Sequence, residues 1–333
     1  MKILITGAAG FIGYHTVKYY CNLGYDVIGI DNINNYYEVS LKFDRLKDCG
    51  IVFNEEIITK SIISIKYPNY RFVKLDIIDS FALNILFENE KFDLIIHLAA
   101  QAGVRYSIEN PQVYIQTNLV GFANILEACR FYNVKKIVYA SSSSVYGMSQ
   151  KKILSVSDNV DLPISLYAAT KKSNELMAHV YSHLYGISTI GLRFFTVYGP
   201  WGRPDMAPFI FSKSIISGEP IKIFNHGNLK RDFTYIDDIV EGIAKVSTEN
   251  HKSNYEIYNI GNSQPINVLN FIQILEKELG VNANKDFVAM QPGDVKETWA
   301  DISELVNLFG YEPKVKIEEG VKRFIKWYKE YYN

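Results

Sequence analysis

The chain has 333 residues, of which 48% are hydrophobic and 21% are charged, and its formal net charge is -1. This composition is close to that of average globular proteins, which excludes a disordered chain, a collagen-like repeat and a coiled coil. At roughly 150 residues per domain, the length predicts about two domains. The balanced charge creates no overall field that would attract nucleic acid or an anionic membrane, so we expect neither as a partner.

Predicted strands and helices alternate in the first part of the chain. The predicted strands are Lys2–Thr6, Asp26–Ile30, Arg71–Leu75, Leu94–Leu98, Lys136–Ala140 and Thr189–Phe195. The predicted helices are Phe11–Leu23, Ser80–Asn89, Pro111–Tyr132 and Leu166–Tyr185. Strands that alternate with helices favour parallel pairing with right-handed crossovers, so we expect an α/β fold with a doubly wound, Rossmann-type parallel sheet. The segment 42–69 predicts no clear element.

The alternation stops after Gly199, where prolines cluster and the predicted elements become shorter. We therefore expect one domain over residues 1–187 and a smaller, mixed domain over residues 188–333, with some later segments returning to the first domain. A last amphipathic stretch predicts a helix over Ile317–Tyr332.

The cysteines and the N-terminus indicate a reducing compartment. Cys21, Cys49 and Cys129 are odd in number and lie in apolar contexts, which predicts buried free thiols. The short apolar start of the chain runs directly into glycines, which argues against a signal peptide. No apolar run is long enough to span a bilayer. We expect a cytoplasmic protein, and no metal site, because no histidine has a cysteine partner.

A glycine-rich turn, Gly7–Gly13, follows the first predicted strand and opens a helix. Glycines at this spacing let the backbone approach a pyrophosphate, and the helix N-terminus adds partial positive charge. Alone, the glycines would also suit a simple turn. Asp31, at the end of the second strand, is placed to accept the ribose hydroxyls of an adenosine. Because this acid repels a 2′-phosphate, and Asn32 and Ile33 supply no arginine, the pattern favours NAD over NADP.

Tyr167 and Lys171 are one turn apart on a predicted helix. A nearby ammonium group lowers the pKa of a phenol, so we expect Tyr167 to act as a general base or acid. The serines of Ser141–Ser144 end the fifth predicted strand, at the edge where a doubly wound sheet binds its ligand. A serine-rich turn without a catalytic role is the alternative for part of this run.

Eight motifs, in order along the chain, resemble those of nucleotide-sugar 4-epimerases of the extended short-chain dehydrogenase/reductase superfamily. They are ITGAAGFIG from Ile5, HLAAQAGVRYS from His97, SSSSVYG from Ser141, YAATKKSNE from Tyr167, LRFFTVYGPWGRPDM from Leu192, RDFTYIDD from Arg231, YNIGNSQP from Tyr258 and QPGDV from Gln291. The resemblance extends over essentially the whole chain. It implies an NAD-binding domain at 1–187 and a nucleotide-sugar-binding domain at 188–333.

The resemblance also implies roles for individual residues, with Ser142, Tyr167 and Lys171 as the catalytic set. The implied cofactor-binding residues are Gly7, Gly10, Phe11, Ile12, Gly13, Asp31, Asn32, Asp76, Ile77, Leu98, Ala99, Ala100, Asn118, Tyr167 and Lys171. The implied substrate-binding residues are Gln101, Arg105, Ser142, Ser143, Ser144, Thr196, Arg203, Arg231 and Asp294. His97 resembles a residue that positions the backbone. Gln291 replaces the arginine of many family members, although the glucuronate branch shares the glutamine.

The implied reaction is NAD-dependent epimerisation at C4, from UDP-glucuronate to UDP-galacturonate through a 4-keto intermediate. Alternatives on the same fold are epimerases of UDP-glucose or UDP-N-acetylglucosamine, a UDP-glucuronate decarboxylase and a 4,6-dehydratase. The last two typically have a carboxylate where this chain has Ser143 and Ser144. A different class, a non-catalytic NAD(P)-sensing regulator, typically lacks the pair that Tyr167 and Lys171 form here.

The resemblance further implies two partners, a UDP-sugar and a second copy of the chain. The long predicted helices Pro111–Tyr132 and Leu166–Tyr185 correspond to those that pair across a two-fold axis in this family. We therefore expect a homodimer.

Overall fold

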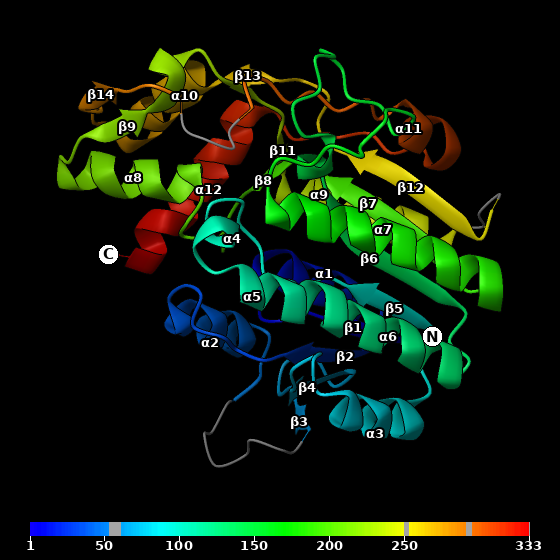
Figure 1. Cartoon of the computed structure of the whole chain (residues 1–333). Coiled ribbons are helices and arrows are strands. Elements are labelled where there is room, and N and C mark those ends of the chain that lie inside the picture. Colours follow the sequence, from blue (N-terminus) through cyan, green and yellow to red (C-terminus); the bar gives the residue numbers. More distant parts are fainter. Residues whose placement is uncertain (53–60, 250–252, 291–294, 333) are drawn as a thin grey trace.

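The computed structural model describes residues 1–52, 61–249, 253–290 and 295–332. Within these ranges an eight-stranded sheet has the order β12-β7-β6-β5-β1-β2-β4-β3 (Figure 1). Its strands are β1 (Lys2–Thr6), β2 (Asp26–Asp31), β3 (Ile62–Ile63), β4 (Tyr70–Lys74), β5 (Leu94–His97), β6 (Lys136–Ser142), β7 (Ser188–Phe194) and β12 (Tyr255–Ile260). Every neighbouring pair is parallel except β3 with β4. The prediction of a doubly wound α/β fold is therefore confirmed.

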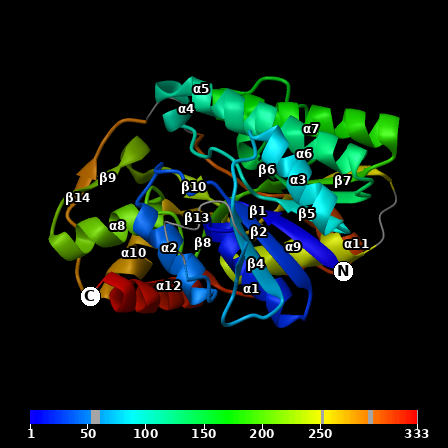
Figure 2. The same ribbon diagram turned by 90° about the horizontal axis from the view of Figure 1, so that it is seen from below.

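Helices cover both faces of the sheet, as the two views show (Figures 1 and 2). One face carries α3 (Ser80–Glu90), α5 (Pro111–Tyr114), α6 (Gly121–Phe131) and α7 (Leu166–Tyr185), and the other carries α1 (Phe11–Asn22) and α9 (Ile236–Thr248). Successive strand residues point to opposite faces. Ile3 and Ile5 accordingly pack with Val17 and Ile239, while Leu4 packs in the core on the other face. Both faces of β1 are therefore buried, which explains why its three central residues are all apolar.

The predicted helix Pro111–Tyr132 contains an irregular turn. It consists of α5, a π-helical segment η1 (Ile115–Val120) and α6. Within η1, the backbone carbonyl of Asn118 accepts a hydrogen bond from Nδ2 of Asn174 on α7, at 2.6 Å. A π-helical turn changes the i→i−4 pairing and is often found at functional sites. The sequence did not predict this turn, because the contact with α7 is made across the fold.

The other predicted elements occur with ends that are unchanged or shifted by one or two residues. Thus the strand predicted over Arg71–Leu75 is β4, Tyr70–Lys74, and the last predicted helix is α12 (Ile317–Tyr332) as expected. The segment without a clear prediction contains most of α2 (Val39–Asp48) and β3, and part of it lies outside the described residues.

A smaller part of the molecule lies beside the carboxyl edge of the sheet (Figure 1). Its helices are α8 (Ala207–Ser217), α10 (Val268–Leu279) and α12. Its strand pairs are β8 (Thr196–Tyr198) with β11 (Phe233–Tyr235), β9 (Ile221–Ile223) with β14 (Lys285–Phe287), and β10 (Lys230–Arg231) with β13 (Ile266–Asn267). Phe209, Phe271 and Phe324 lie in its core. The domain division after residue 187 stays a prediction, and β7 and β12, which follow it, are strands of the large sheet.

Two further expectations concern burial. Cys21, Cys49 and Cys129 are free and buried, which confirms that prediction. Burial raises the pKa of Cys21 and of Cys49 to about 12, so both stay protonated thiols at neutral pH. In the described part of the chain, no helix is both long and apolar enough to cross a membrane.

A buried ion pair joins α7 to β7 beneath the carboxyl edge. Nε and Nη2 of Arg193 each donate to a carboxylate oxygen of Glu175 at 2.9 Å, and neither side chain is more than 3% exposed. The Ser141 hydroxyl donates to Glu175 Oε1 at 2.6 Å, and Arg193 Nη1 donates to the Tyr146 hydroxyl at 3.1 Å. The pair thus supports the strand end that carries the serine run.

We predict that Glu175→Gln lowers the free energy of unfolding by about 3–5 kcal/mol, because Arg193 keeps its charge in the interior without a counter-charge. Urea denaturation followed by circular dichroism measures this. Glu319→Gln is the matched control, since it removes the exposed partner of Arg323 on α12 and should cost less than about 1 kcal/mol. Equal losses in the two variants would contradict the prediction.

Candidate active site

A cleft opens at the carboxyl edge of the sheet, where the strand order reverses between β1 and β5. Ligands of doubly wound sheets bind at this topological switch point. Most of the predicted site residues line the cleft. They are Gly7, Gly10, Phe11, Ile12, Gly13, Asp31, Asn32, Asp76, Ile77, Leu98, Ala99, Ala100, Gln101, Ser142, Ser143, Ser144, Tyr167, Lys171, Thr196 and Arg203.

Three predicted site residues within the described part of the chain do not line it. Asn118 is buried behind the cleft, and its side-chain amide holds the backbone of Gln101 by accepting from the N–H at 2.8 Å and donating to the carbonyl at 3.0 Å. The guanidinium carbon of Arg105 lies 5.1 Å from the ring centre of Phe224 in η3 (Phe224–Gly227). Arg231 donates to the carbonyl of Lys230 at 2.9 Å. The roles of Arg105 and Arg231 in binding substrate stay predictions. Gln291 and Asp294 lie outside the described residues.

The glycine turn packs too closely for side chains. A Cβ on Gly13 would lie 2.0 Å from the carbonyl oxygen of Gly7, and a Cβ on Gly7 would lie 2.9 Å from the backbone nitrogen of Ala99. Gly7 also has a φ of +72°, which favours glycine. No side chain caps α1 at Gly10, so the partial positive charge of the helix start faces the cleft and fits a diphosphate.

The carboxylate of Asp31 is held in one orientation by the backbone. It accepts from Ala9 N at 3.2 Å and from Ile33 N at 2.8 Å. Lys42 on α2, which the sequence analysis missed, places its ammonium nitrogen 3.8 Å from Asp31 Oδ1 and donates to Asn34 Oδ1 at 2.9 Å. Nothing in the spacing indicated Lys42, because it reaches the cleft only through the packing of α2. Although Lys42 lies beside it, the buried Asp31 carboxylate can still accept hydrogen bonds from a pair of ribose hydroxyls.

Arg45, also on α2, is a second residue that the sequence did not indicate. It is fully buried, and all five of its N–H donors are used. They bond the carbonyl of Ala9 at 2.9 Å, the Tyr37 hydroxyl at 2.6 Å, the carbonyl of Trp201 at 3.1 and 2.7 Å, and the carbonyl of Gly202 at 3.0 Å. Arg45 thereby joins the glycine turn to the loop that carries Arg203.

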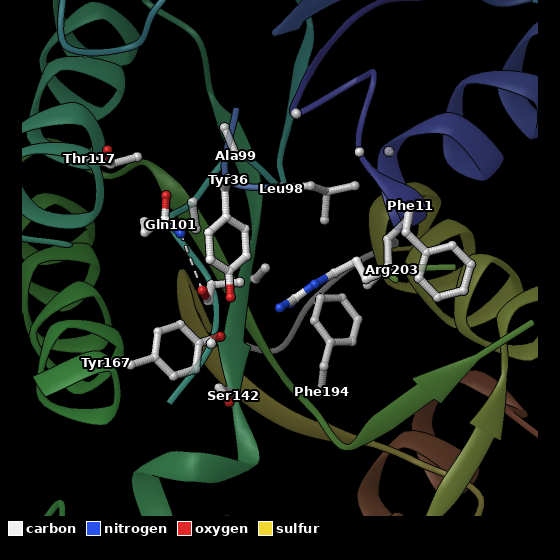
Figure 3. A pocket seen from close by; sticks show the side chains of 18 of the residues that line it. Phe11, Tyr36, Leu98, Ala99, Gln101, Thr117, Ser142, Tyr167, Phe194 and Arg203 are labelled. Carbon is white, nitrogen blue, oxygen red and sulfur yellow. Dashed lines mark hydrogen bonds between the residues drawn. The ribbon is translucent and has the colours of Figure 1, made fainter. Parts of the chain in front are cut away.

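The cleft brings the three predicted catalytic side chains together, with Ser142 and Tyr167 side by side (Figure 3). Lys171 is buried and donates to the carbonyl of Ala140 at 2.7 Å, and burial lowers its pKa to about 8 against the opposing charge of Glu175. Burial raises the pKa of Tyr167 above 10, which its hydrogen bond with Ser142 and the charge of Arg203 oppose.

One expectation about the three predicted catalytic side chains is wrong. We expected Lys171 to lower the pKa of Tyr167, but burial is the larger effect and raises it. Lys171 contacts Ala140 instead, and Arg203 is the cation that favours the phenolate of Tyr167. A spacing of one helical turn predicts a shared face, whereas the direction of a long lysine side chain is set by its surroundings.

His97 at the end of β5 positions the backbone. The Thr6 hydroxyl accepts from the N–H groups of Leu98 at 3.1 Å and Ala99 at 3.0 Å, so it donates its own proton to Nδ1 of His97, at 2.9 Å. Burial lowers the pKa of His97 to about 3, which keeps the ring neutral. This contact agrees with the positioning role expected for His97, which stays a prediction.

Arg203 points into the cleft between Tyr36 and Phe194 (Figure 3). Its Nε donates to Asp205 Oδ1 at 3.0 Å, and its Nη2 donates to Asp205 Oδ2. Tyr36 donates its hydroxyl to the same Oδ2 at 3.0 Å. The Nε–Nη2 edge of the guanidinium, one of the two edges that can pair with a carboxylate, is therefore already paired within the protein.

His179 and His183 are one turn apart on α7, a spacing that metal ligands also use. Their rings are parallel, with centres 6.4 Å apart. Where residues are described, no group of three or more His, Cys, Asp or Glu side chains is arranged to hold a metal ion.

Comparisons with known proteins agree with this geometry. Residues 3–261 match the model of the NAD dependent epimerase/dehydratase family. Protein CapI of Staphylococcus aureus is 49% identical over 100% of this chain and 99% of its own length. UDP-glucuronate 4-epimerase 1 of Arabidopsis thaliana is 45% identical over 100% of this chain and 77% of its own length.

A solved structure is similar over the same extent. The UDP-glucuronic acid 4-epimerase of Bacillus cereus, crystallised with UDP-glucuronic acid and NAD, is 35% identical, has a TM-score of 0.88, and is matched over 99% of each chain. Both the family model and these relatives extend over most of the sequence, and the chain belongs to the NAD dependent epimerase/dehydratase family.

Proposed function

We propose that this chain is an NAD-dependent UDP-glucuronate 4-epimerase, which interconverts UDP-glucuronate and UDP-galacturonate. The observation that carries the proposal is that one cleft combines Tyr167 and Ser142, a pair suited to proton transfer, with Arg203, a cation suited to a sugar carboxylate. The relatives from Arabidopsis thaliana and Bacillus cereus support the same activity and substrate.

The residues of the cleft fit NAD. The uncapped start of α1 suits the diphosphate, the Asp31 carboxylate suits the adenosine ribose, and Lys171 lies where the nicotinamide half is expected. When bound here, NAD⁺ would supply the acceptor for the hydride of sugar C4 and, once reduced, the donor that returns it. The net change in cofactor is zero.

The chain itself supplies the proton transfer and the orientation. Tyr167 takes the proton of the 4-hydroxyl, and Ser142 donates a hydrogen bond to the same sugar oxygen. Arg203 stabilises the phenolate of Tyr167 by its charge. Since the pKa of Lys171 is about 8, this side chain is mostly charged at neutral pH and loses its charge as the pH rises through that value.

The sugar must be held with either face towards Tyr167. Ser143, Ser144 and Thr196 offer short hydroxyls in the cleft, and Arg203 offers N–H donors to a carboxylate. Serines in place of carboxylates beside Ser142 leave decarboxylation and elimination without the acid or base that those reactions need. This favours epimerisation over the two alternatives on the same fold.

We predict that Tyr167→Phe lowers kcat by about 10²–10⁴-fold, the usual contribution of a positioned proton-transfer group. Ser142→Ala should lose less, because Tyr167 remains. Bound NAD, assayed in the supernatant of the denatured protein, should be retained in both variants. Tyr19→Phe on α1, outside this cleft, is the control. Near-normal turnover of Tyr167→Phe would remove this residue from the mechanism.

We predict that Arg203→Ala costs about 1.5–3 kcal/mol of transition-state binding for UDP-glucuronate, the scale of a hydrogen bond to a charged group. Values of kcat/KM for UDP-glucuronate and UDP-glucose, measured on the wild type and the variant, check this. Arg323→Ala on α12 removes an exposed arginine and serves as the control. If the wild type used the two sugars equally well, the assignment of UDP-glucuronate would fail.

We also propose a homodimer that works in the cytoplasm. The buried free thiols support a reducing compartment. On α7, which packs against α6, Leu176, Val180 and Leu184 are 56%, 47% and 61% exposed and four residues apart, so they form one apolar stripe. Stripes of this kind pair with a second copy in helical bundles.

Light scattering at micromolar concentrations should therefore give the mass of two chains. The double variant Leu176→Glu/Val180→Glu should shift the mass to one chain, since it places charges in the proposed interface. Leu23→Glu, at an exposed position after α1, is the control for added charge and should stay dimeric. A wild type with the mass of one chain at all these concentrations would show that the apolar faces of these helices serve only to cover the sheet.

A further inference from the structure

We propose that Asp205 is a positioning residue that limits how tightly the site binds an anionic sugar. It holds the guanidinium of Arg203 in the protein without substrate and gives this group up to the carboxylate of the sugar. The inference rests on the proposed function, because it concerns how the same site binds the carboxylate of that sugar. It adds a second residue to the recognition of charge.

The geometry shows that Asp205 already occupies the place of a ligand. Both of its oxygens accept from one edge of Arg203, Nε to Oδ1 at 3.0 Å and Nη2 to Oδ2. This paired arrangement is the one that arginine forms with a carboxylate ligand. An incoming sugar carboxylate therefore finds the preferred edge of Arg203 taken, and must displace Asp205 from it.

Tyr36 lowers the free-energy cost of the exchange. Its hydroxyl donates to Asp205 Oδ2 at 3.0 Å, so Asp205 keeps a hydrogen bond when Arg203 turns away. The Asp205 side chain is also 31% exposed, which lets water solvate the released carboxylate. Burial would raise the pKa of Asp205, but Arg203 and Tyr36 lower it overall, so this side chain is ionised at neutral pH.

The backbone beside Arg203 stays in place during the exchange. Arg45 donates to the carbonyls of Trp201 and Gly202, and it is completely buried. The exchange therefore requires a new direction of the Arg203 side chain and no movement of the preceding loop.

The exchange affects only sugars that carry a carboxylate. UDP-glucuronate replaces one charged pair of Arg203 with another, so the cost of losing Asp205 is largely recovered. A neutral sugar offers a hydroxymethyl group, which cannot replace a carboxylate at a guanidinium, so Arg203 stays with Asp205. Asp205 thereby weakens the binding of every ligand that competes for Arg203 and leaves the binding of neutral sugars unchanged.

The test measures dissociation constants of UDP-glucuronate and UDP-glucose by calorimetry on the NAD-loaded protein, together with kcat. Asp205→Asn keeps the shape but removes the competing charge, so we expect UDP-glucuronate to bind about three- to tenfold more tightly, where tenfold corresponds to 1.4 kcal/mol. The affinity for UDP-glucose should change less than about twofold. Asp205→Glu restores the carboxylate and should bring the affinity for UDP-glucuronate back towards that of the wild type.

A second variant should shift the affinity in the opposite direction. Tyr36→Phe removes the hydrogen bond that retains Asp205, so Asp205 depends more on Arg203 and UDP-glucuronate should bind about three- to tenfold more weakly. Damage to the fold would instead weaken the binding of both sugars, in both variants. Glu319→Gln, which removes one acidic partner of Arg323 outside the cleft, controls for the removal of an arginine partner.

Weaker or unchanged binding of UDP-glucuronate by Asp205→Asn would overturn the proposal, as would an equal gain for UDP-glucose. The proposed function fails separately, since in that case the wild type would not interconvert UDP-glucuronate and UDP-galacturonate at all.

Discussion

The geometry of the cleft depends on the buried guanidinium of Arg45. In the described part of the chain no carboxylate pairs with it, so backbone carbonyls and one hydroxyl satisfy this cation. Losing such a contact would leave a charged donor unsatisfied in the interior, which is costly. The glycine turn, through Ala9, and the loop at Trp201 and Gly202 are therefore held at a constant separation. A cofactor bound at the glycine turn and a substrate bound beside this loop would therefore keep a fixed position relative to each other.

Charge in the cleft is arranged in pairs of opposite sign. Asp31 ends β2 and meets Lys42 from α2, while Arg203 and Asp205 share a loop whose carboxylate also meets Tyr36. Each pair balances its own charge. Binding of an anionic nucleotide sugar therefore depends on local donors and on exchange of partners within the cleft.

The parallel sheet explains why distant segments meet there. Strands that run in one direction deliver all their carboxyl ends to one edge, and the order reverses between β1 and β5. A few side-chain contacts then fix the positions of these strand ends. Thr6 ties β1 to the residues after β5 and to His97, and the ion pair of Glu175 with Arg193 ties α7 to β7. The hydroxyls of Ser142 and Tyr167 are brought together from β6 and α7 by this scaffold.

Periodicity and local motifs predicted six of the eight described strands of the large sheet, the helices α1, α3, α7 and α12 and the glycine turn, because these depend on patterns between near neighbours in the chain. Most of the cleft residues came instead from the resemblance to the family. Arg45, Lys42 and Asp205 escaped prediction, since a charged residue on a helix or loop looks the same in sequence whether it faces solvent or a buried partner. The direction of the pKa shift of Tyr167 was missed for the same reason. Burial and the partner of a long side chain are properties of the packed molecule, and only the tertiary structure decided them.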